Sequence, residues 1–544
     1  MYKNTNSFRT LESKSREGAR LFTLALILGC LICASISLAE GIQGLVATGH
    51  DSRIDLKWTP SQTGAVPGYN IYRSPDGREP FVKLNDKPHV PNIYSDFISE
   101  NNRTFYYRVA PVANSAASSL QPPASSLIVS ARSREMSDDE LLTSVQEATS
   151  RYFWDFAHPV SGLARERNHG GDCVTAGGTG FGLMVIMVGA ERGFVAREQA
   201  ASRVLKMVTF LQEKADRFHG AWPHWLNGAT GKTIPFSIKK FDDGADLVET
   251  SFLIQGMLTV RQYFGRKDPV EEEIRRRVTQ LWREVEWDWF LQKPGSRKLY
   301  WHWSPNYGWK KNLAIGGRFN ECMITYLLAI ASPTHAIPPE CYYEGWAASP
   351  QYANGGTHYD IKQWVGRPLG GPLFFTHYSF LGFDPRHKRD RFCDYFENNR
   401  NISLIHHAYG VANPQGHKGY GPMVWGLTAS DGPDGYTASA PDRDTGTVAP
   451  TAALSAMPYT PEASIATLKY YYRQLGPRLW GEFGFHDAFN LDRDWFAKSY
   501  IAIDQGPIVC MIENYRTGLC WRMFMANPEI APMLKAIGWQ ISNP

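Results

Sequence analysis

The sequence predicts a mainly α-helical chain, in which a toroid of paired helices follows a small N-terminal β-sandwich. Three observations support this fold class. With 544 residues the chain is too long for one ordinary domain. Residues 41–133 contain short alternating strand patterns separated by turn residues. From residue 137 to 544, apolar residues follow the helical period, and mostly buried segments alternate with segments that keep one polar face.

The first 39 residues have the pattern of a secretion signal peptide. Basic residues in 14–20 precede an apolar stretch that ends in small residues at Ala39. We therefore expect cleavage before Glu40 and a secreted or periplasmic protein. A membrane anchor and a lipid attached at Cys30 are the alternatives. No later segment has 18 unbroken apolar residues, so no membrane span is expected in the mature chain.

Residues 41–133 are expected to form an antiparallel sandwich. The segment "RIDLKWTP" alternates, which places Ile54, Leu56 and Trp58 on one face. The segments "GYNIYRS", "TFYYRVAPVA" and "SSLIVSAR" supply further strands. This pattern resembles a fibronectin type III domain, in which Trp58 would be the strand-B tryptophan and "YNIYR" and "YYRVAPV" the strands C and F. Such modules usually serve as spacers or contact domains.

A helical domain is expected to begin at Ser137, which can cap a helix and form a capping box with Glu140. The helical segments that follow are 141–157, 178–193, 195–215, 245–264, 270–290, 320–331, 461–476 and 503–519. An ordinary bundle is the alternative to a toroid. Long loops rich in glycine and aromatic residues favour the toroid, because long loops in compact domains are usually functional.

The composition restricts the class of partner. The net charge is +4 and there is no run of Lys or Arg, so nucleic acid is not an expected partner. Aromatic residues make up 13% of the chain, which suits either a large core or stacking against sugars. Two of the eight cysteines precede Glu40, and the other six match no metal motif. Cys322 with Cys341 and Cys510 with Cys520 are possible disulfides.

Two groups of carboxylates stand directly before apolar helices. In "DDGADLVET" a helix that starts near residue 243 would place Asp242 and Asp246 on one face, with Glu249 three residues further. Glu321 opens the apolar segment "CMITYLLAIA". A carboxyl group that is partly desolvated there would hold a proton near neutral pH, as a general acid must. Simple helix capping is the alternative in both places.

Two further acidic segments are candidates. The Gly/Pro-rich segment 425–453 contains Asp431 and is expected to be a long loop, where turn formation alone would also explain its acids. The segment 479–516 contains Asp487, and it places Asp504 and Glu513 in or before an apolar helix. There is no P-loop, no HExxH and no serine elbow. Paired carboxylates with many aromatic residues in an exported protein indicate glycoside hydrolysis.

Seven long segments occur in a consistent order along the helical part: "TGFGLMVIMVGAERGFVAREQA", "DDGADLVETSFLIQGMLTVRQYF", "NECMITYLLAIASPTHAIP", "WGLTASDGPDGY", "GTVAPTAALSAMPYTPEASI", "WGEFGFHDAFN" and "IDQGPIVCMIENYRTGLCW". They resemble the glucoamylase-like domain family, which includes glycoside hydrolase family 144, the bacterial endo-β-1,2-glucanases. The resemblance implies an (α/α)6 toroid, no metal, and endo-acting, inverting hydrolysis of β-1,2-glucan to short sophoro-oligosaccharides. It matches Glu321 to a proton donor, Asp242 and Asp246 to acids needed for activity, and Asp504, more loosely, to a base.

The sequence therefore predicts an enzyme with Glu321, Asp504, Asp242 and Asp246 as catalytic residues and no cofactor or metal. The substrate-binding residues expected beside them are Glu249, Trp222, Trp303, Trp425, Asp431, Tyr436, Trp480, His486 and Asp487. The expected partner is a glucan polysaccharide or oligosaccharide. Exo action, another β-glucan as substrate, and a non-catalytic glycan-binding protein remain alternatives. A polysaccharide lyase is disfavoured, because a pocket of acids would repel an anionic uronate.

Overall fold

The computed structural model describes residues 42–60, 66–112, 127–237, 241–348, 350 and 352–542. The expected signal peptide and Cys30 lie outside these residues. The chain divides into two compact units. One contains the described residues up to Ala47, with Leu56–Asn92 and Thr104–Ala131, and the other contains Thr48–Asp55, Ile93–Arg103 and the chain from Arg132 on. No helix among the described residues is long and apolar enough to cross a membrane.

The N-terminal strands form two sheets. The first has the order β1-β2-β5, and the second has the order β4-β3-β6-β7, in which β3 pairs antiparallel with both β4 and β6. Ile54, Leu56 and Trp58 are buried on one face of β2, as their alternation predicts. The ring of Trp58 lies 5.1 Å from that of Tyr69 in the other sheet. The strands are β1 (Gln43–His50), β2 (Arg53–Thr59), β3 (Tyr69–Ser74), β4 (Val82–Lys83), β5 (Ile93–Phe97), β6 (Thr104–Pro111) and β7 (Val129–Arg132).

The remainder of the chain is mostly helical. Its first helix, α2 (Asp138–Trp154), begins with the predicted capping box between Ser137 and Glu140. The others are α3 (Ala176–Glu191), α4 (Arg197–Glu213), α5 (Leu247–Tyr263), α6 (Pro269–Glu284), α7 (Met323–Ala331), α8 (Tyr395–Ala412), α9 (Pro450–Ser455), α10 (Pro461–Tyr470), α11 (Gly476–Leu479), α12 (Ala502–Arg516), α13 (Leu519–Met525) and α14 (Ile530–Ala536). Helices α8, α9, α13 and α14 are not among the helical segments expected above.

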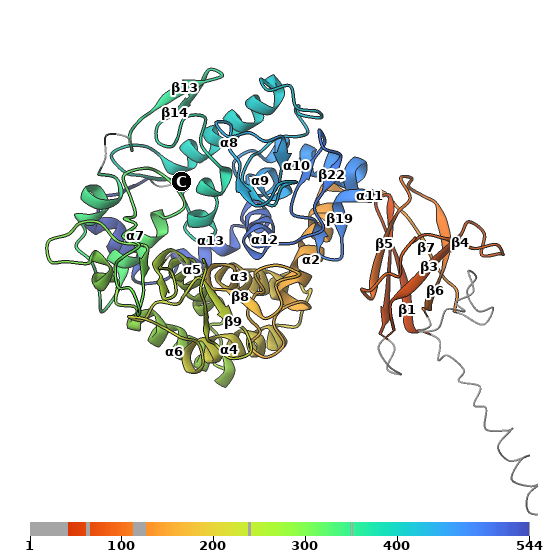
Figure 1. Ribbon diagram of the computed structural model, residues 1–544, viewed down its shortest axis with the longest axis horizontal. Coiled ribbons are helices and arrows are strands. Elements are labelled where there is room, and N and C mark those ends of the chain that lie inside the picture. Colours follow the sequence, from red (N-terminus) through yellow and green to blue (C-terminus); the bar gives the residue numbers. More distant parts are fainter. Residues whose placement is uncertain are drawn as a thin grey trace, which may run out of the picture. The chain divides into compact units, whose positions relative to one another are not determined.

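Buried helices lie inside amphipathic ones. Helices α3, α5 and α12 are buried along most of their length, whereas α4 and α6 keep exposed polar faces and lie at the rim of the helical part (Figure 1). Glycines bring α3 and α5 into close contact. A Cβ atom on Gly180 would lie 2.2 Å from the carbonyl oxygen of Phe252, and one on Gly256 would lie 2.0 Å from that of Gly180.

Short strands in the connections join the helix ends. They are β8 (Cys173–Thr175), β9 (Trp225–Asn227), β10 (Thr233–Ile234), β11 (Ala245–Asp246), β12 (His302–Trp303), β13 (Gly356–His358), β14 (Ile361–Gln363), β15 (Lys388–Arg389), β16 (Ala429–Ser430), β17 (Thr437–Ala438), β18 (Thr447–Val448), β19 (Trp480–Gly481), β20 (Gly484–Phe485), β21 (Phe489–Asn490), β22 (Trp495–Phe496) and β23 (Gln540–Ile541). The pair β11–β12 matters for the site, because it places Asp246 opposite His302.

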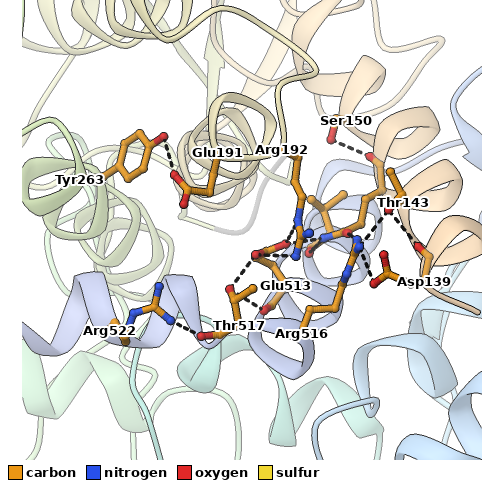
Figure 2. Close-up of polar contacts among 12 residues, drawn as sticks. Asp139, Thr143, Ser150, Glu191, Arg192, Tyr263, Glu513, Arg516, Thr517 and Arg522 are labelled. Atoms are coloured by element: carbon orange, nitrogen blue, oxygen red, sulfur yellow. Dashed lines mark hydrogen bonds and ion pairs between the residues drawn. The ribbon is translucent and has the colours of Figure 1, made fainter.

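A buried ion pair near the C-terminal end of α12 holds this helix together with α2 and α3. Glu513 is fully buried, and its carboxylate accepts from the guanidinium of Arg192 at 2.7 and 3.0 Å and from Thr517 at 2.7 Å (Figure 2). The side chain of Gln146 on α2 donates to it at 3.1 Å. The sequence offered Glu513 as a candidate site residue. In the structure its carboxylate joins α12 to α2 and to the end of α3.

The six cysteines in the described part of the chain are all free thiols. The disulfides considered for Cys322 with Cys341 and for Cys510 with Cys520 are therefore wrong. Cys510 and Cys520 nevertheless face each other, and hydrogen bonding from Cys510 together with burial raises the pKa of the Cys520 thiol. Each pair of thiols lies within a well-packed helical core, where the fold holds them without a covalent link.

Candidate active site

A cavity of about 330 Å³ lies among the loops at the helix ends. This volume is within the range of small-ligand sites. The walls combine charged, aromatic and aliphatic side chains, as sugar sites do. They are formed by Glu166, Arg167, Thr175, His224, Trp225, Phe236, Glu249, Tyr436, Ile501 and Ile503.

Asp246 caps helix α5 and is held in its ionised form. Its Oδ1 atom accepts from the backbone N–H groups of Val248 and Glu249 at 3.1 and 3.0 Å, and its Oδ2 atom lies 2.9 Å from Nδ1 of His224. Burial alone would raise the pKa of Asp246, but His302, His224 and the helix N–H groups outweigh it and lower that pKa. Asp246 thus positions His224 on the cavity wall.

Glu249 follows one helical turn later and lines the cavity. Its Oε2 atom accepts from the backbone of Gly177 at 2.8 Å and from the hydroxyl of Thr175 at 3.1 Å. Burial raises the pKa of Glu249, and the negative charge of Asp246 acts in the same direction. The pKa values of Asp246 and Glu249, which both belong to the start of α5, are therefore shifted in opposite directions.

Asp242 does not share a helix face with Asp246, contrary to the expectation above. Helix α5 begins only at Leu247, so Asp242 stands in the preceding turn. Its carboxylate is held by Nζ of Lys311 at 2.7 Å and by the hydroxyl of Ser237 at 2.9 Å. Although burial opposes this, these contacts lower the pKa of Asp242. Asp242 is therefore an ion-paired carboxylate, and it is not among the residues that line the cavity.

Glu321 is a buried carboxyl group with a raised pKa. It precedes α7, which begins at Met323, and its Oε2 atom is buried with no hydrogen-bond partner among the described residues. Burial raises the pKa of Glu321 to about 7, and the charge of Glu249 acts in the same direction. A carboxyl group with this pKa is protonated in much of the enzyme population at neutral pH.

Asp487 and Asp504 form a buried pair of carboxyl groups. Both are 1% exposed. Burial and the neighbouring Asp487 raise the pKa of Asp504 well above its usual range. Burial raises the pKa of Asp487 to about 7, although the hydrogen bond that it accepts from the backbone of Asp431 acts in the opposite direction. Asp504 therefore keeps its proton near neutral pH, whereas Asp487 is partly ionised.

Arg167 joins the cavity wall to the Gly/Pro-rich loop. Its guanidinium donates to Glu166 at 2.7 and 3.1 Å and to both carboxylate oxygens of Asp431 at 3.1 and 3.2 Å. Asp431 also accepts from the hydroxyl of Ser499 at 2.5 Å, and its backbone N–H donates to Asp487 at 2.7 Å. The expected substrate residue Asp431 is thus tied to the acid pair.

Tyr436 covers the cavity from the same loop. The residue is 48% exposed, yet it lines the cavity, and the charges of Asp504 and Asp487 act on its hydroxyl. Part of the side chain is therefore open to solvent at the cavity. A ring held in this way can stack against a sugar at the entrance.

Comparisons with known proteins identify related enzymes. A protein from Parabacteroides distasonis (strain ATCC 8503), named exo beta-1,2-glucooligosaccharide sophorohydrolase (non-reducing end), is 45% identical over 511 residues, which cover 90% of this chain and 70% of that protein. Residues 316–528 match the family described as "Putative glucoamylase".

The chain belongs to the glucoamylase-like glycoside hydrolases.

Solved structures of this enzyme family have the same fold. A β-1,2-glucanase from Parabacteroides distasonis matches with a TM-score of 0.85 and 44% identity over 92% of this chain and 73% of that one. An endo-β-1,2-glucanase from Chitinophaga pinensis, solved with sophorotriose and glucose, matches with a TM-score of 0.72 and 50% identity over 75% of this chain and 99% of that one. The resemblance to glycoside hydrolase family 144 is therefore confirmed.

In this glucoamylase-like hydrolase, three of the expected sugar-binding tryptophans lie in the core. Trp222 is fully buried and donates to the carbonyl oxygen of Leu211, and Trp425 donates to the hydroxyl of Thr467 at 2.8 Å. Trp480 packs edge-on against Phe485. These rings have no face free for a sugar, because aromatic residues near a site are also the residues that fill its core.

Two other expected residues lie outside the cavity wall. His486 is buried beside the ring of Tyr500, and burial lowers its pKa to about 4, so it stays neutral. Trp303 is half-buried and packs edge-on against His219 at 4.8 Å. Trp303 follows His302, which faces Asp246, and so lies one residue from the site.

Several site residues were not predicted from the sequence. Glu166 and Arg167 lie in a loop without a recognisable motif, and His224 and Phe236 lie near short strands that carry no helical pattern. Trp225, three residues after the expected Trp222, also lines the cavity. Among the described residues no group of three or more His, Cys, Asp and Glu side chains is arranged to hold a metal ion.

Proposed function

We propose that this enzyme hydrolyses β-1,2-linked glucan chains with Glu321 as the general acid. The observation that carries the proposal is a buried carboxyl oxygen of Glu321 with no partner and a pKa near 7, in the field of a cavity-lining acid. Glu321 would donate its proton to the glycosidic oxygen as the bond to the anomeric carbon breaks. The substrate class rests on the two relatives named above.

The base in this proposal is the Asp487–Asp504 pair. Because Asp504 keeps its proton while Asp487 is partly ionised near neutral pH, the Asp487 carboxylate can accept a proton from water. The water oxygen then bonds to the anomeric carbon on the face opposite the leaving group. This is inversion, for which the reacting carboxyl oxygens should lie about 6.5–9.5 Å apart.

We favour exo action, with release of a disaccharide, over the endo action expected from the motifs. The exo-acting relative is similar over 90% of this chain, which must include part of the segment before residue 132, whereas the endo enzyme from Chitinophaga pinensis is similar over 75%. The bound oligosaccharide of that endo enzyme keeps endo action as the second candidate. The fold proposal is an (α/α)6 toroid, supported by buried helices that lie inside amphipathic ones (Figure 1).

The test is digestion of linear β-1,2-glucan, laminarin and starch by the mature chain. Exo action should release sophorose from the first minutes while the polymer shortens slowly, whereas endo action would shorten it at once. Proton NMR of the first product should detect the α-anomer. Cleavage of starch alone would contradict the substrate. Sequencing of the N-terminus from an exporting host should begin at Glu40 if the signal peptide is real.

A further inference from the structure

Tyr378 is a buried tyrosine next to the segment of Glu321, because the hydroxyl of the following residue, Ser379, donates to the carbonyl oxygen of Glu321. It begins the 3₁₀ helix Tyr378–Phe380 and is 5% exposed. Its ring is fixed by three phenylalanines from α3, α5 and the segment before it. The ring centroids lie 5.1 Å from Phe181, 5.6 Å from Phe252 and 5.1 Å from Phe374.

The hydroxyl of Tyr378 has no hydrogen-bond partner in the described part of the protein. Burying a hydroxyl without a partner destabilises the fold, so a purely structural position would normally be occupied by phenylalanine. Among the other buried tyrosines, Tyr472 also has a hydroxyl without a partner in the described residues, whereas Tyr459 has two. The hydroxyl of Tyr459 donates to the carbonyl oxygen of Thr376 at 3.2 Å and accepts from Asn399 at 3.3 Å.

The groups around this hydroxyl belong to the proposed chemistry. Burial raises the pKa of Tyr378 well above its usual range, and the charges of Asp504, Glu249 and Glu321 act in the same direction. The phenol therefore stays protonated and can donate. Glu321 and Asp504 also have buried oxygen atoms without partners among the described residues. Phe181, whose ring contacts Tyr378, also packs against Gly506, two residues after Asp504. Unpartnered polar groups from three segments that are distant in sequence therefore belong to one packed region, as they do where a reactant binds.

We propose that Tyr378 is a catalytic residue whose hydroxyl donates a hydrogen bond to the attacking water beside Asp504. The water would use one lone pair for this bond and the other for the anomeric carbon. Its proton goes to the carboxylate of the Asp487–Asp504 pair, and the electrons of the broken glycosidic bond go to the oxygen that Glu321 protonates. The proposal rests on the function proposed above and adds the group that orients the nucleophile.

The test compares Tyr378→Phe with Tyr459→Phe in the full mature chain. Tyr378→Phe keeps all three ring contacts, so kcat on β-1,2-glucan should fall about 10- to 100-fold with little change in KM, since one aligned hydrogen bond is lost. Its Tm should stay equal or rise, because a buried unpaired hydroxyl is removed. Tyr459→Phe should lower Tm and leave kcat unchanged.

Other outcomes overturn the proposal. If Tyr378→Phe keeps the wild-type kcat, the hydroxyl meets only a structural water. If its Tm falls and kcat does not, the hydroxyl has a structural partner. A wild-type enzyme inactive on β-1,2-glucan contradicts the proposed substrate instead, and the two variants are then compared on whichever of laminarin and starch is cleaved.

Discussion

The guanidinium of Arg167 lies 3.1 Å from Oδ1 of Asp431, although 264 residues separate them in the chain. The same guanidinium binds Glu166 on the cavity wall. The loop that carries Tyr436 is thereby fixed to the wall, and the backbone N–H of Asp431 reaches Asp487 of the acid pair. The position of the loop and the proton affinity of the pair are therefore linked through one arginine.

Replacing Arg167 with lysine should raise KM about tenfold, because an ammonium group cannot bind two carboxylates with the geometry of a guanidinium. Steady-state kinetics on β-1,2-glucan oligosaccharides would measure the change. Arg478→Lys is the matched control, since Arg478 pairs with Asp494 on the surface. An unchanged KM in the Arg167 variant would mean that the loop keeps its place without this contact.

Glu321→Gln should lower kcat on the glucan by at least about a thousandfold, because the leaving oxygen loses its proton donor. A 2,4-dinitrophenyl β-sophoroside needs no such proton, so its cleavage should fall far less. The comparison of the two substrates checks the role. Equal losses on both, or a near-normal rate on the glucan, would assign the acid elsewhere.

The pH dependence should follow the raised pKa of Glu321. The rate should fall as pH rises through about 7, because the acid loses its proton. The same shift acts on stability. The folded protein binds this proton more tightly than the unfolded chain does. The contribution of Glu321 to stability is therefore most favourable below about pH 4.5, and it becomes less favourable as the pH rises to about 7. Glu321→Gln should therefore raise Tm at pH 8 and change it little at pH 5.

Glu513→Gln should destabilise the fold by about 3 kcal/mol and leave kcat unchanged, because Arg192 loses a charged partner in a buried pair. Chemical unfolding and kinetics would be measured on the same preparation. Glu397→Gln, at an exposed pair with Arg400, should change neither. A fall in kcat at full stability would give Glu513 a role in the site.

The six cysteines from Cys173 to Cys520 should all react as thiols once the mature chain is unfolded. Titration with Ellman's reagent in guanidinium chloride, without reductant, should find six per chain. Two fewer thiols would indicate that one disulfide forms in the exported protein.

Local patterns were sufficient for much of the fold. The capping box of Ser137 and Glu140, the alternation of Ile54, Leu56 and Trp58, and the main helical segments depend on neighbours within a few residues, and all are found in the structure. The raised pKa of Glu321 was also predictable, because an apolar helix that follows a carboxyl group removes water from it.

Only the tertiary structure decided which acids and rings meet. Asp242 pairs with Lys311 across 69 residues, and Asp431 pairs with Arg167 across 264. Trp222 fills the core while Tyr436 lines the cavity, although either ring could serve both purposes. The physical reason is that a carboxyl group takes its proton affinity, and a ring its exposure, from whichever neighbours packing brings against it. Those neighbours are distant in sequence, so no local pattern records them.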